Sequence, residues 1–343
     1  MWFNPKKLII VDINENKLAE AIRDIRSTPY LNLPEIITYP IDFGSNVFEK
    51  LFDYHKPFDI VANFAAHKHV RSEKDIFSIE AMFQTNFIKA ERLLQLLAKN
   101  PPKHFFCVST DKATKPVNIM GATKKLMEDV VFAYQDIFKV TTARFANVAF
   151  SNGSLLESFI NRFENGQPLV CPNDIRRYFV SPIEAGQLCL LANICGNSGE
   201  IFIPKLNPEK DLVPIKNALL FFLEEQGLFP KEFASEEQVK RAAAERMSSD
   251  STYPIFLPTS DTTGEKPIEE FYAVNDILDE NRFNALNVIE TFKGEKKSVE
   301  NLLDEAQKTF EKEITKKDLV IFLEKYVDGF KHEEKGKHLD QKL

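Results

Sequence analysis

Short apolar segments alternate with helical patterns through the first half of the chain, and this alternation limits the fold more than any other feature. The helical stretches carry apolar residues three and four positions apart, as the buried face of an amphipathic helix does. Each stretch is long enough to connect two parallel strands. The predicted strands are 8–12, 36–42, 58–64 and 104–110, and the predicted helices are 15–27, 45–55 and 75–100. We therefore expect an α/β fold, a doubly wound parallel sheet of the Rossmann type.

The second half of the chain is less regular. Residues 206–262 are rich in Glu, Lys and Ala, which predicts helices and loops that cover a site or an interface. The other predicted elements are a strand at 139–148, a helix at 156–166, a strand at 199–204 and a helical segment at 296–328. We expect three parts: a Rossmann-type domain over 1–147, a smaller region over 148–290, and a helical extension with a tail over 291–343.

A glycine-rich phosphate loop is missing from its usual place. Of the twelve glycines only Gly196 and Gly199 approach the spacing GxxGxxG, and they come late in the chain. The first predicted strand ends at Asp12, where the second strand of a nucleotide-binding sheet carries the acid for an adenosine ribose; an aspartate there can also cap a helix. The pattern predicts a sheet whose first βα unit is absent. Either the chain is a fragment, or it holds phosphates in another way.

Composition narrows the class of protein. A formal charge of −7 and a pI near 5.6 argue against a general nucleic-acid binder. We expect no membrane span and a cytoplasmic location, because no run of eighteen apolar residues occurs and the N-terminal residues do not resemble a signal peptide. His67 and His69 flank Lys68, but no carboxylate or cysteine lies at ligand spacing, so we expect no metal site.

An acid and an amine are adjacent at the end of a predicted buried strand. Asp111 and Lys112 directly follow strand 104–110, on the edge where open α/β sheets place their sites. Lys124 lies twelve residues after Lys112, where a following helix can return to the same edge. A structural explanation stays open, in which Asp111 caps the turn and Lys112 is solvated. The three together favour a site.

The ordered motifs of the chain carry a family resemblance. These are VANFAAHKHVRSEKD (61–75), FCVSTDKATKPVNIMGATKK (106–125), ARFANVAFSNGSLLESF (143–159), NDIRRYFVSPIEA (173–185), GEIFIPKL (199–206) and TTGEKPIEEFY (262–272). Over residues 7–290 the chain closely resembles the extended short-chain dehydrogenases/reductases that act as UDP-N-acetylglucosamine 4,6-dehydratases in capsule, lipopolysaccharide and flagellin-glycan synthesis. The resemblance implies binding of NAD by 1–147 and of a UDP-sugar by 148–290, and commonly a homo-oligomer.

The resemblance also implies cofactor-binding residues. An acid at position 12 would repel the 2′-phosphate of NADP, so NAD is expected. Lys124 matches the lysine of the family's Tyr-x-x-x-Lys pattern. The implied cofactor residues are Asp12, Asn14, Lys17, Asp42, Phe43, Lys68 and Lys124.

The tyrosine of that pattern is replaced here by Met120, which cannot exchange a proton. The same replacement occurs in the branch of dehydratases that retains the configuration at C5, where a Thr-Asp-Lys triplet is understood to transfer protons. The implied catalytic residues are therefore Thr110, Asp111, Lys112 and Lys124. The implied UDP-sugar contacts are Asn147, Leu155, Phe159, Arg177 and Glu265. The arginine that usually precedes Gly-Glu-Lys is absent, because Thr262 and Thr263 occupy those positions.

Two alternatives stay open beside a dehydratase. One is a UDP-sugar C4 epimerase or reductase of the same family, against which Met120 counts because these enzymes normally keep the tyrosine. The other is a catalytically silent fragment or interaction protein, which the absent glycine loop supports.

Overall fold

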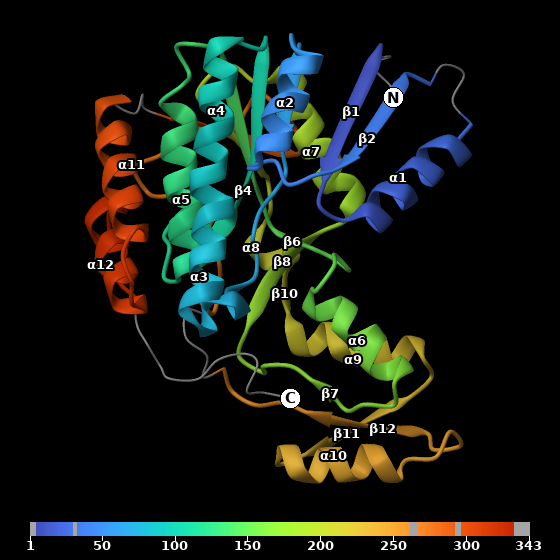
Figure 1. The fold of residues 1–343 in the computed structure, drawn as a ribbon. Coiled ribbons are helices and arrows are strands. Elements are labelled where there is room, and N and C mark those ends of the chain that lie inside the picture. Colours follow the sequence, from blue (N-terminus) through green and yellow to red (C-terminus); the bar gives the residue numbers. More distant parts are fainter. Residues whose placement is uncertain (1–4, 30–32, 261–265, 292–295, 333–343) are drawn as a thin grey trace.

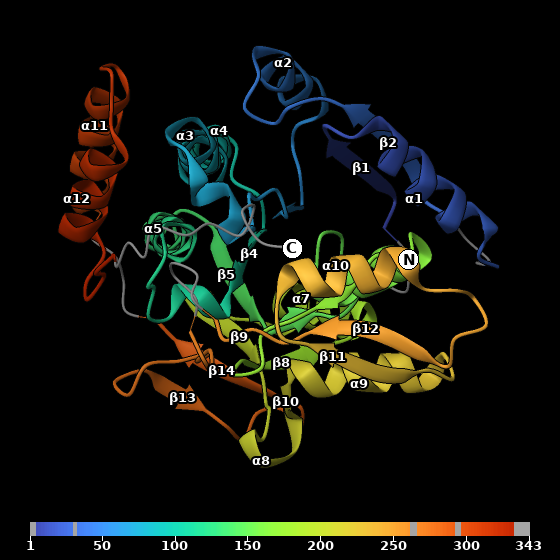
Figure 2. The same cartoon turned by 90° about the horizontal axis from the view of Figure 1, so that it is seen from below.

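The computed structural model of the chain describes residues 5–29, 33–260, 266–291 and 296–332. Its largest sheet, which contains β4 in Figure 1, has six strands in the order β13-β14-β9-β5-β4-β3; all of them but β3 are labelled in Figure 2. The four strands β3, β4, β5 and β9 are parallel to one another. β14 pairs antiparallel with β9, and β13 pairs antiparallel with β14. The strands are β3 (Ile60–Asn63), β4 (His104–Thr110), β5 (Lys139–Phe145), β9 (Glu200–Pro204), β13 (Ile277–Asp279) and β14 (Leu286–Glu290). The expected α/β, Rossmann-type fold is confirmed.

Helices cover both faces of this sheet. Neighbouring residues of β4 show the two faces: Phe105 packs into the core beneath α4 and α5, and Phe106 packs against α7. A strand buried on both faces reads as an uninterrupted apolar run, which explains the sequence of β4. The helices are α3 (Ile76–Phe83), α4 (Lys89–Lys99) and α5 (Ile119–Phe132) on one face and α7 (Pro182–Cys195) on the other.

The first two strands form a sheet of their own. β1 (Lys7–Asp12) and β2 (Glu35–Pro40) pair in parallel, and α1 (Glu15–Ser27) packs on them (Figure 2). The following helix, α2 (Asn46–His55), is tied to α4 by the Arg92–Glu49 ion pair at 2.5 Å. In the described part of the chain β1 pairs with β2 alone and β3 with β4 alone.

Two three-stranded sheets and four helices form a second region. Phe159, Leu219 and Tyr253 are fully buried in its separate apolar cluster. The sheets are β10 (Leu212–Pro214), β8 (Arg176–Val180), β6 (Asn147–Val148), and β11 (Phe229–Phe233), β12 (Thr252–Phe256), β7 (Leu169–Val170). The helices are α6 (Leu155–Glu164), α8 (Pro208–Asp211), α9 (Ile215–Glu225) and α10 (Glu236–Glu245).

The structure corrects four expected elements. Residues 206–262 contain three strands as well as helices, because β11 is stabilised by pairing with β12 and its own exposed, charged sequence gives no strand signal. The strand expected at 139–148 is two strands, since the chain changes sheet at Ala146. The helix expected at 75–100 is interrupted by a π-helical turn, η2 (Gln84–Ile88). The segment expected at 296–328 forms two helices, α11 (Lys296–Phe310) and α12 (Lys316–Tyr326), which pack on α5.

The sequence region 148–290 contributes to both parts of the molecule. Its strands β9, β13 and β14 join the six-stranded sheet, and its remaining strands form the second region. The three-part division of the chain remains a prediction, and the tail after residue 332 lies outside the described residues. No helix of the described residues has the length and apolar character needed to cross a membrane.

Candidate active site

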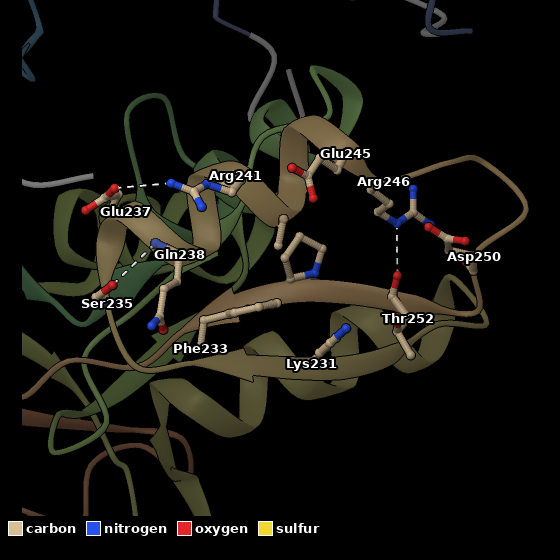
Figure 3. A pocket seen from close by; sticks show the side chains of 12 residues that line it. Lys231, Phe233, Ser235, Glu237, Gln238, Arg241, Glu245, Arg246, Asp250 and Thr252 are labelled. Carbon is tan, nitrogen blue, oxygen red and sulfur yellow. Dashed lines mark hydrogen bonds and ion pairs between the residues drawn. The ribbon is translucent and has the colours of Figure 1, made fainter.

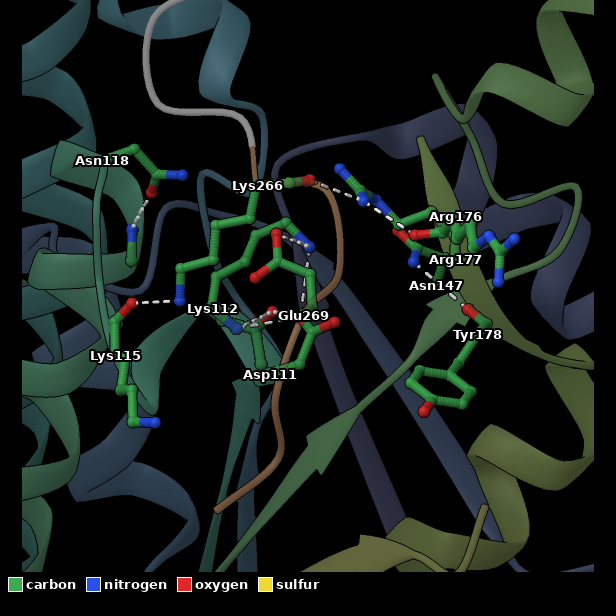
Figure 4. A network of polar contacts seen from close by, with 12 residues as sticks. Asp111, Lys112, Lys115, Asn118, Asn147, Arg176, Arg177, Tyr178, Lys266 and Glu269 are labelled. Carbon is green, nitrogen blue, oxygen red and sulfur yellow. Dashed lines mark hydrogen bonds and ion pairs between the residues drawn. The ribbon is translucent and has the colours of Figure 1, made fainter. Parts of the chain in front are cut away.

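Asp111 and Lys112 form a buried ion pair at the carboxyl end of β4, in the 3-10 turn η3 (Asp111–Ala113) (Figure 4). The Asp111 side chain is 3% exposed and that of Lys112 is 18% exposed, so Lys112 is not the solvated lysine of the structural alternative. Asp111 Oδ1 accepts hydrogen bonds from Thr110 Oγ1 at 2.8 Å, from the Lys112 backbone N–H at 2.9 Å and from Lys112 Nζ at 3.1 Å. Asp111 thus shapes the turn and also holds the ammonium group.

Glu269 is the second carboxylate at Lys112. Its Oε1 lies 3.7 Å from Lys112 Nζ, and its side chain is 4% exposed. Its Oε2 is buried without a hydrogen-bond partner among the described residues. The sequence does not single out Glu269, because nothing in the spacing separates it from Glu270, which pairs with Lys115 at 2.9 Å near the surface.

Two arginines fix the segment that carries Glu269. Arg177 Nη1 donates to the carbonyl oxygens of Lys266 at 2.8 Å and Pro267 at 3.1 Å (Figure 4). Arg144 Nη1 donates to the carbonyl oxygen of Phe271 at 2.9 Å. The segment is therefore held on both sides of Glu269, which places its carboxylate against Lys112.

Arg144 is itself held by a buried ion pair. Its Nε and Nη2 donate to the two carboxylate oxygens of Glu128 at 2.9 and 2.8 Å, and Ser109 Oγ donates to Glu128 at 2.6 Å. Burial alone would raise the pKa of Glu128, but the Arg144 guanidinium holds that pKa below its usual range. A bidentate pair of this kind fixes α5, β4 and β5 relative to the 266–271 segment.

The charges at Lys112 shift its own titration and that of Glu269. Burial by itself lowers the pKa of Lys112, but the carboxylates of Asp111 and Glu269 together raise it above its usual range. Burial raises the pKa of Glu269; the Lys112 ammonium opposes this shift and the Asp111 carboxylate adds to it. One ammonium group thus serves two buried carboxyl groups.

Lys124 lies on α5 and reaches back to β4. Its Nζ donates to the carbonyl oxygen of Val108 at 2.7 Å, and burial lowers its pKa. Met120, one turn earlier, is 2% exposed, and its backbone N–H donates to Glu73 at 2.9 Å. The structure therefore brings Lys124 and the Asp111–Lys112 pair to one strand, and Met120 supplies no hydroxyl on α5.

Close contact between α5 and the Asp111–Lys112 turn depends on a glycine. Asn118 caps α5 by accepting the Gly121 backbone N–H at 2.7 Å. A Cβ atom at Gly121 would lie 2.5 Å from the Lys112 carbonyl oxygen, closer than real contacts allow. Gly121 is therefore needed for the approach of helix and turn.

The other expected cofactor residues lie at the ends of the first two strands. Asp12 accepts the Asn14 backbone N–H at 2.8 Å, but Asn14, not Asp12, caps α1 by accepting the Lys17 N–H. Lys17 Nζ pairs with Glu20 at 2.8 Å. Asp42 binds Lys89 at 2.5 Å. Next to Asp42, Phe43 contacts the ring of Phe48 edge-on.

Lys68 lies on the loop after β3, and this loop is held by a residue that the sequence did not single out. Buried Asn86, in η2, accepts the His67 backbone N–H at 2.8 Å and donates to the His67 carbonyl at 3.0 Å. Asn86 also donates to Thr123 of α5 at 3.1 Å. Partial burial lowers the pKa of Lys68. The π-helical turn thus positions this loop next to α5.

The expected UDP-sugar residues fall into different environments. Asn147 Nδ2 donates to the carbonyl oxygen of Tyr178 at 3.2 Å. Tyr178 directly follows Arg177 on β8. On α6, Leu155 is exposed and Phe159 is buried in the second apolar cluster. Glu265 lies outside the described residues.

A pocket elsewhere in the second region contains none of these residues. It lies between α10 and the strands β11 and β12, and its charged side chains include Lys231, Arg241 and Arg246 (Figure 3). Arg241 pairs with Glu237 at 3.4 Å, and Arg246 Nε donates to the Thr252 carbonyl at 2.9 Å. We therefore place the candidate active site at β4.

Known proteins resemble this chain in sequence. The capsular polysaccharide biosynthesis protein CapD of Staphylococcus aureus is 28% identical over 64% of this chain and 37% of CapD. The UDP-glucose 4-epimerase of Rickettsia bellii is 31% identical over 65% of this chain and 65% of the epimerase. The chain thus spans less than two thirds of the length of either relative.

A solved structure shows the same fold. It is that of the dTDP-glucose 4,6-dehydratase DesIV of Streptomyces venezuelae, a double mutant with NAD and DAU bound, with a TM-score of 0.56 and 17% identity over 77% of this chain and 78% of that one. Residues 1–241 match a family model described as polysaccharide biosynthesis protein. The chain belongs to this family of polysaccharide biosynthesis proteins.

Proposed function

We propose that this chain catalyses the NAD-dependent 4,6-dehydration of UDP-N-acetylglucosamine, or a similar UDP-sugar, to a UDP-4-keto-6-deoxy sugar for surface glycan synthesis. One observation carries the proposal. The Asp111–Lys112 ion pair is buried at the carboxyl end of β4, Lys124 donates to the Val108 carbonyl of the same strand, and buried Met120 stands in place of the family's tyrosine. Dehydration needs an acid and a base within reach of two adjacent carbons, and this pair supplies both.

The residues present fit NAD at its adenosine end. Asp12 ends β1, and Asp42 follows β2 by two residues, so their side chains lie at the carboxyl ends of two paired parallel strands. Both side chains reach solvent, and carboxylates there suit ribose hydroxyls. Asn14, Lys17, Phe43 and Lys68 would complete this end, and Lys124 would hold the nicotinamide ribose. When bound, NAD would accept hydride from C4 of the sugar and return it to C6.

The chain's own residues would move the protons. Thr110 Oγ1 would hydrogen-bond the C4 hydroxyl of the sugar. It would accept the proton of that hydroxyl and pass its own proton to Asp111, to which it already donates a hydrogen bond of 2.8 Å. Lys112, as a neutral amine, would remove the proton from C5 and later return a proton there. Asp111 would then protonate the C6 hydroxyl as it leaves as water. Every proton is accounted for, because the water takes the one that left the C4 hydroxyl.

Substrate contacts follow from the resemblance. We assign the UDP-sugar to Asn147, Leu155, Phe159, Arg177 and Glu265. Asn147 and Arg177 lie near the Glu269 segment, which supports this side of the catalytic pair as the sugar side (Figure 4).

A UDP-sugar C4 epimerase is the second candidate, and the Rickettsia bellii relative supports it. Epimerisation needs hydride transfer at C4 and proton transfer at the C4 oxygen, but it removes no proton from carbon, so the amine of the buried acid–amine pair would have no substrate carbon to deprotonate. Met120 also counts against it, since the family's epimerases normally keep the tyrosine.

Incubation with UDP-N-acetylglucosamine and NAD, followed by mass spectrometry, tests the proposal. A product lighter by one water marks the dehydratase. A product of unchanged mass and altered C4 configuration marks the epimerase, and an absence of NAD binding marks a catalytically silent protein.

A further inference from the structure

Lys112 has two carboxyl neighbours, and the two are compensated unequally. Asp111 Oδ1 is 3.1 Å from Lys112 Nζ and accepts two further hydrogen bonds, from Thr110 and from the Lys112 backbone. Glu269 Oε1 is 3.7 Å from the same nitrogen, and its Oε2 has no hydrogen-bond partner among the described residues. Glu269 is 95% buried, with 5% of its surface exposed.

A buried carboxylate with so few partners is costly as an anion. Loss of hydration without replacement hydrogen bonds disfavours the charged form. The charged groups that face Glu269 are Lys112, Asp111, Arg177 and Lys266. The guanidinium of Arg177 donates to the Lys266 and Pro267 carbonyls, and the Lys266 ammonium donates to the Lys115 carbonyl. Lys112 is shared with Asp111, so Glu269 is the group of this cluster best disposed to take up a proton.

The proposed reaction leaves a need for such a group. Lys112 must be a neutral amine before it can remove the C5 proton, and the carboxylates of Asp111 and Glu269 hold it as an ammonium ion while both are charged. Asp111 is reserved for the proton of the C4 hydroxyl. A third group must therefore accept the proton that Lys112 carries.

We propose that Glu269 is a positioning residue of this site, which acts through Lys112 by accepting its proton. In this step a Lys112 N–H bond breaks and a Glu269 O–H bond forms, which leaves a neutral amine and a neutral carboxylic acid. This inference rests on the proposed function. The backbone contacts of Arg177 and Arg144 on either side of Glu269 keep its carboxyl group in place for this transfer.

The substitution Glu269→Gln tests the role, because glutamine has nearly the same shape and cannot accept the proton. We expect kcat for UDP-N-acetylglucosamine dehydration to fall about a hundredfold or more at neutral pH. The rate should then rise with pH, as Lys112 loses its proton to solvent instead. Glu269→Asp should restore part of the rate. Glu270→Gln, at the neighbouring surface pair, should keep the wild-type rate and pH profile.

Two outcomes would overturn the inference. One is a Gln variant whose rate and pH profile are both those of wild type. The other is a loss of rate that is equal at every pH, which a purely structural role would give.

A second measurement needs no substrate. A carboxyl group whose pKa is raised by folding stabilises the native state below its unfolded pKa, about 4.3, and this contribution is lost as the pH rises. The urea midpoint of Glu269→Gln should therefore rise relative to wild type as the pH increases from about 4. If wild-type protein yields no dehydrated product, the proposed function fails, and this urea comparison alone decides whether folding favours the protonated form of Glu269. A difference that is constant with pH would refute that.

Discussion

At the scale of single residues, the site is an ammonium group between two buried carboxyl groups, and Asp111 makes the closer contact. Its Oδ1 connects the Thr110 hydroxyl to the Lys112 ammonium through bonds of 2.8 and 3.1 Å. The proton of the Thr110 hydroxyl can therefore pass to the carboxylate beside the amine without any large movement.

Replacement of Asp111 by Asn should abolish most of the activity. The amide cannot donate a proton to the departing C6 hydroxyl, so we expect kcat to fall by roughly two to four orders of magnitude. Steady-state kinetics with UDP-N-acetylglucosamine and NAD measures this. Asp53→Asn, in an exposed Asp–Lys pair, is the matched control and should leave kcat unchanged. Near-normal turnover of the Asp111 variant would remove Asp111 from the mechanism.

A buried histidine predicts a pH dependence of stability. His104 is 4% exposed, and its Nε2 shares a hydrogen bond of 2.8 Å with Thr141 Oγ1. Burial lowers the pKa of His104 to about 4. In the unfolded chain histidine titrates near 6.5. The neutral ring therefore makes its full contribution to the free energy of unfolding above about pH 6.5. This contribution, up to about 3 kcal/mol, is lost as the pH falls toward 4.

Urea unfolding of wild type and His104→Gln between pH 7 and pH 4 checks this. The wild-type free energy of unfolding should fall more steeply than that of the variant. Equal slopes for the two proteins would show that His104 does not contribute.

Much of the candidate site could be predicted at the residue scale, and the failures have physical causes. Asp111, Lys112 and Lys124 could be selected because a strand end and a following helix bring them to one edge of the sheet. Glu269 could not, because its place depends on contacts that Arg177 and Arg144 make with backbone carbonyls 89 and 127 residues away. No local pattern distinguishes it from exposed Glu270.

At the scale of elements, the approach of α5 to the Asp111–Lys112 turn is the critical contact. A methyl group at Gly121 would lie 2.5 Å from the Lys112 carbonyl oxygen, so the helix or the turn would have to move. Gly121→Ala should lower the free energy of unfolding by roughly 1–3 kcal/mol, and kcat should fall with it.

Gly186→Ala is the control for that substitution. Gly186 lies in α7, and a Cβ atom there meets nothing within 4 Å. It should be neutral or stabilising by up to about 1 kcal/mol, as alanine in an open helical position is. If the two variants were equally stable and active in urea unfolding and kinetic assays, the tight contact at Gly121 would be unimportant.

Elements with strong periodicity could be predicted from sequence, and elements defined by their partners could not. The buried strand β4 and the amphipathic α1 and α2 lie where their patterns indicate. The strand β11 has no apolar alternation and depends on β12 for its ladder. The break between β5 and β6 occurs within one extended segment, because β6 pairs with β8 in another sheet.

At the scale of the whole molecule, the buried Arg144–Glu128 pair connects the six-stranded sheet, α5 and the segment that carries Glu269. Removal of one partner leaves the other as an uncompensated buried charge, so Arg144→Ala should cost about 3–5 kcal/mol of stability. A double-mutant cycle with Glu128→Ala in urea should show strong coupling between the two. Arg241→Ala, from an exposed pair with Glu237, should change stability by no more than about 1 kcal/mol. Additive effects at 128 and 144 would contradict this account.

The most direct test of the proposed reaction is the dehydration assay carried out in deuterium oxide with unlabelled UDP-N-acetylglucosamine and NAD. We expect a product that has lost one water and carries deuterium at C5, since the amine of Lys112 exchanges with solvent before it returns a proton to that carbon. We expect no solvent deuterium at C6, which receives the hydride taken from C4. A product of unchanged mass without deuterium at C5 would contradict the account.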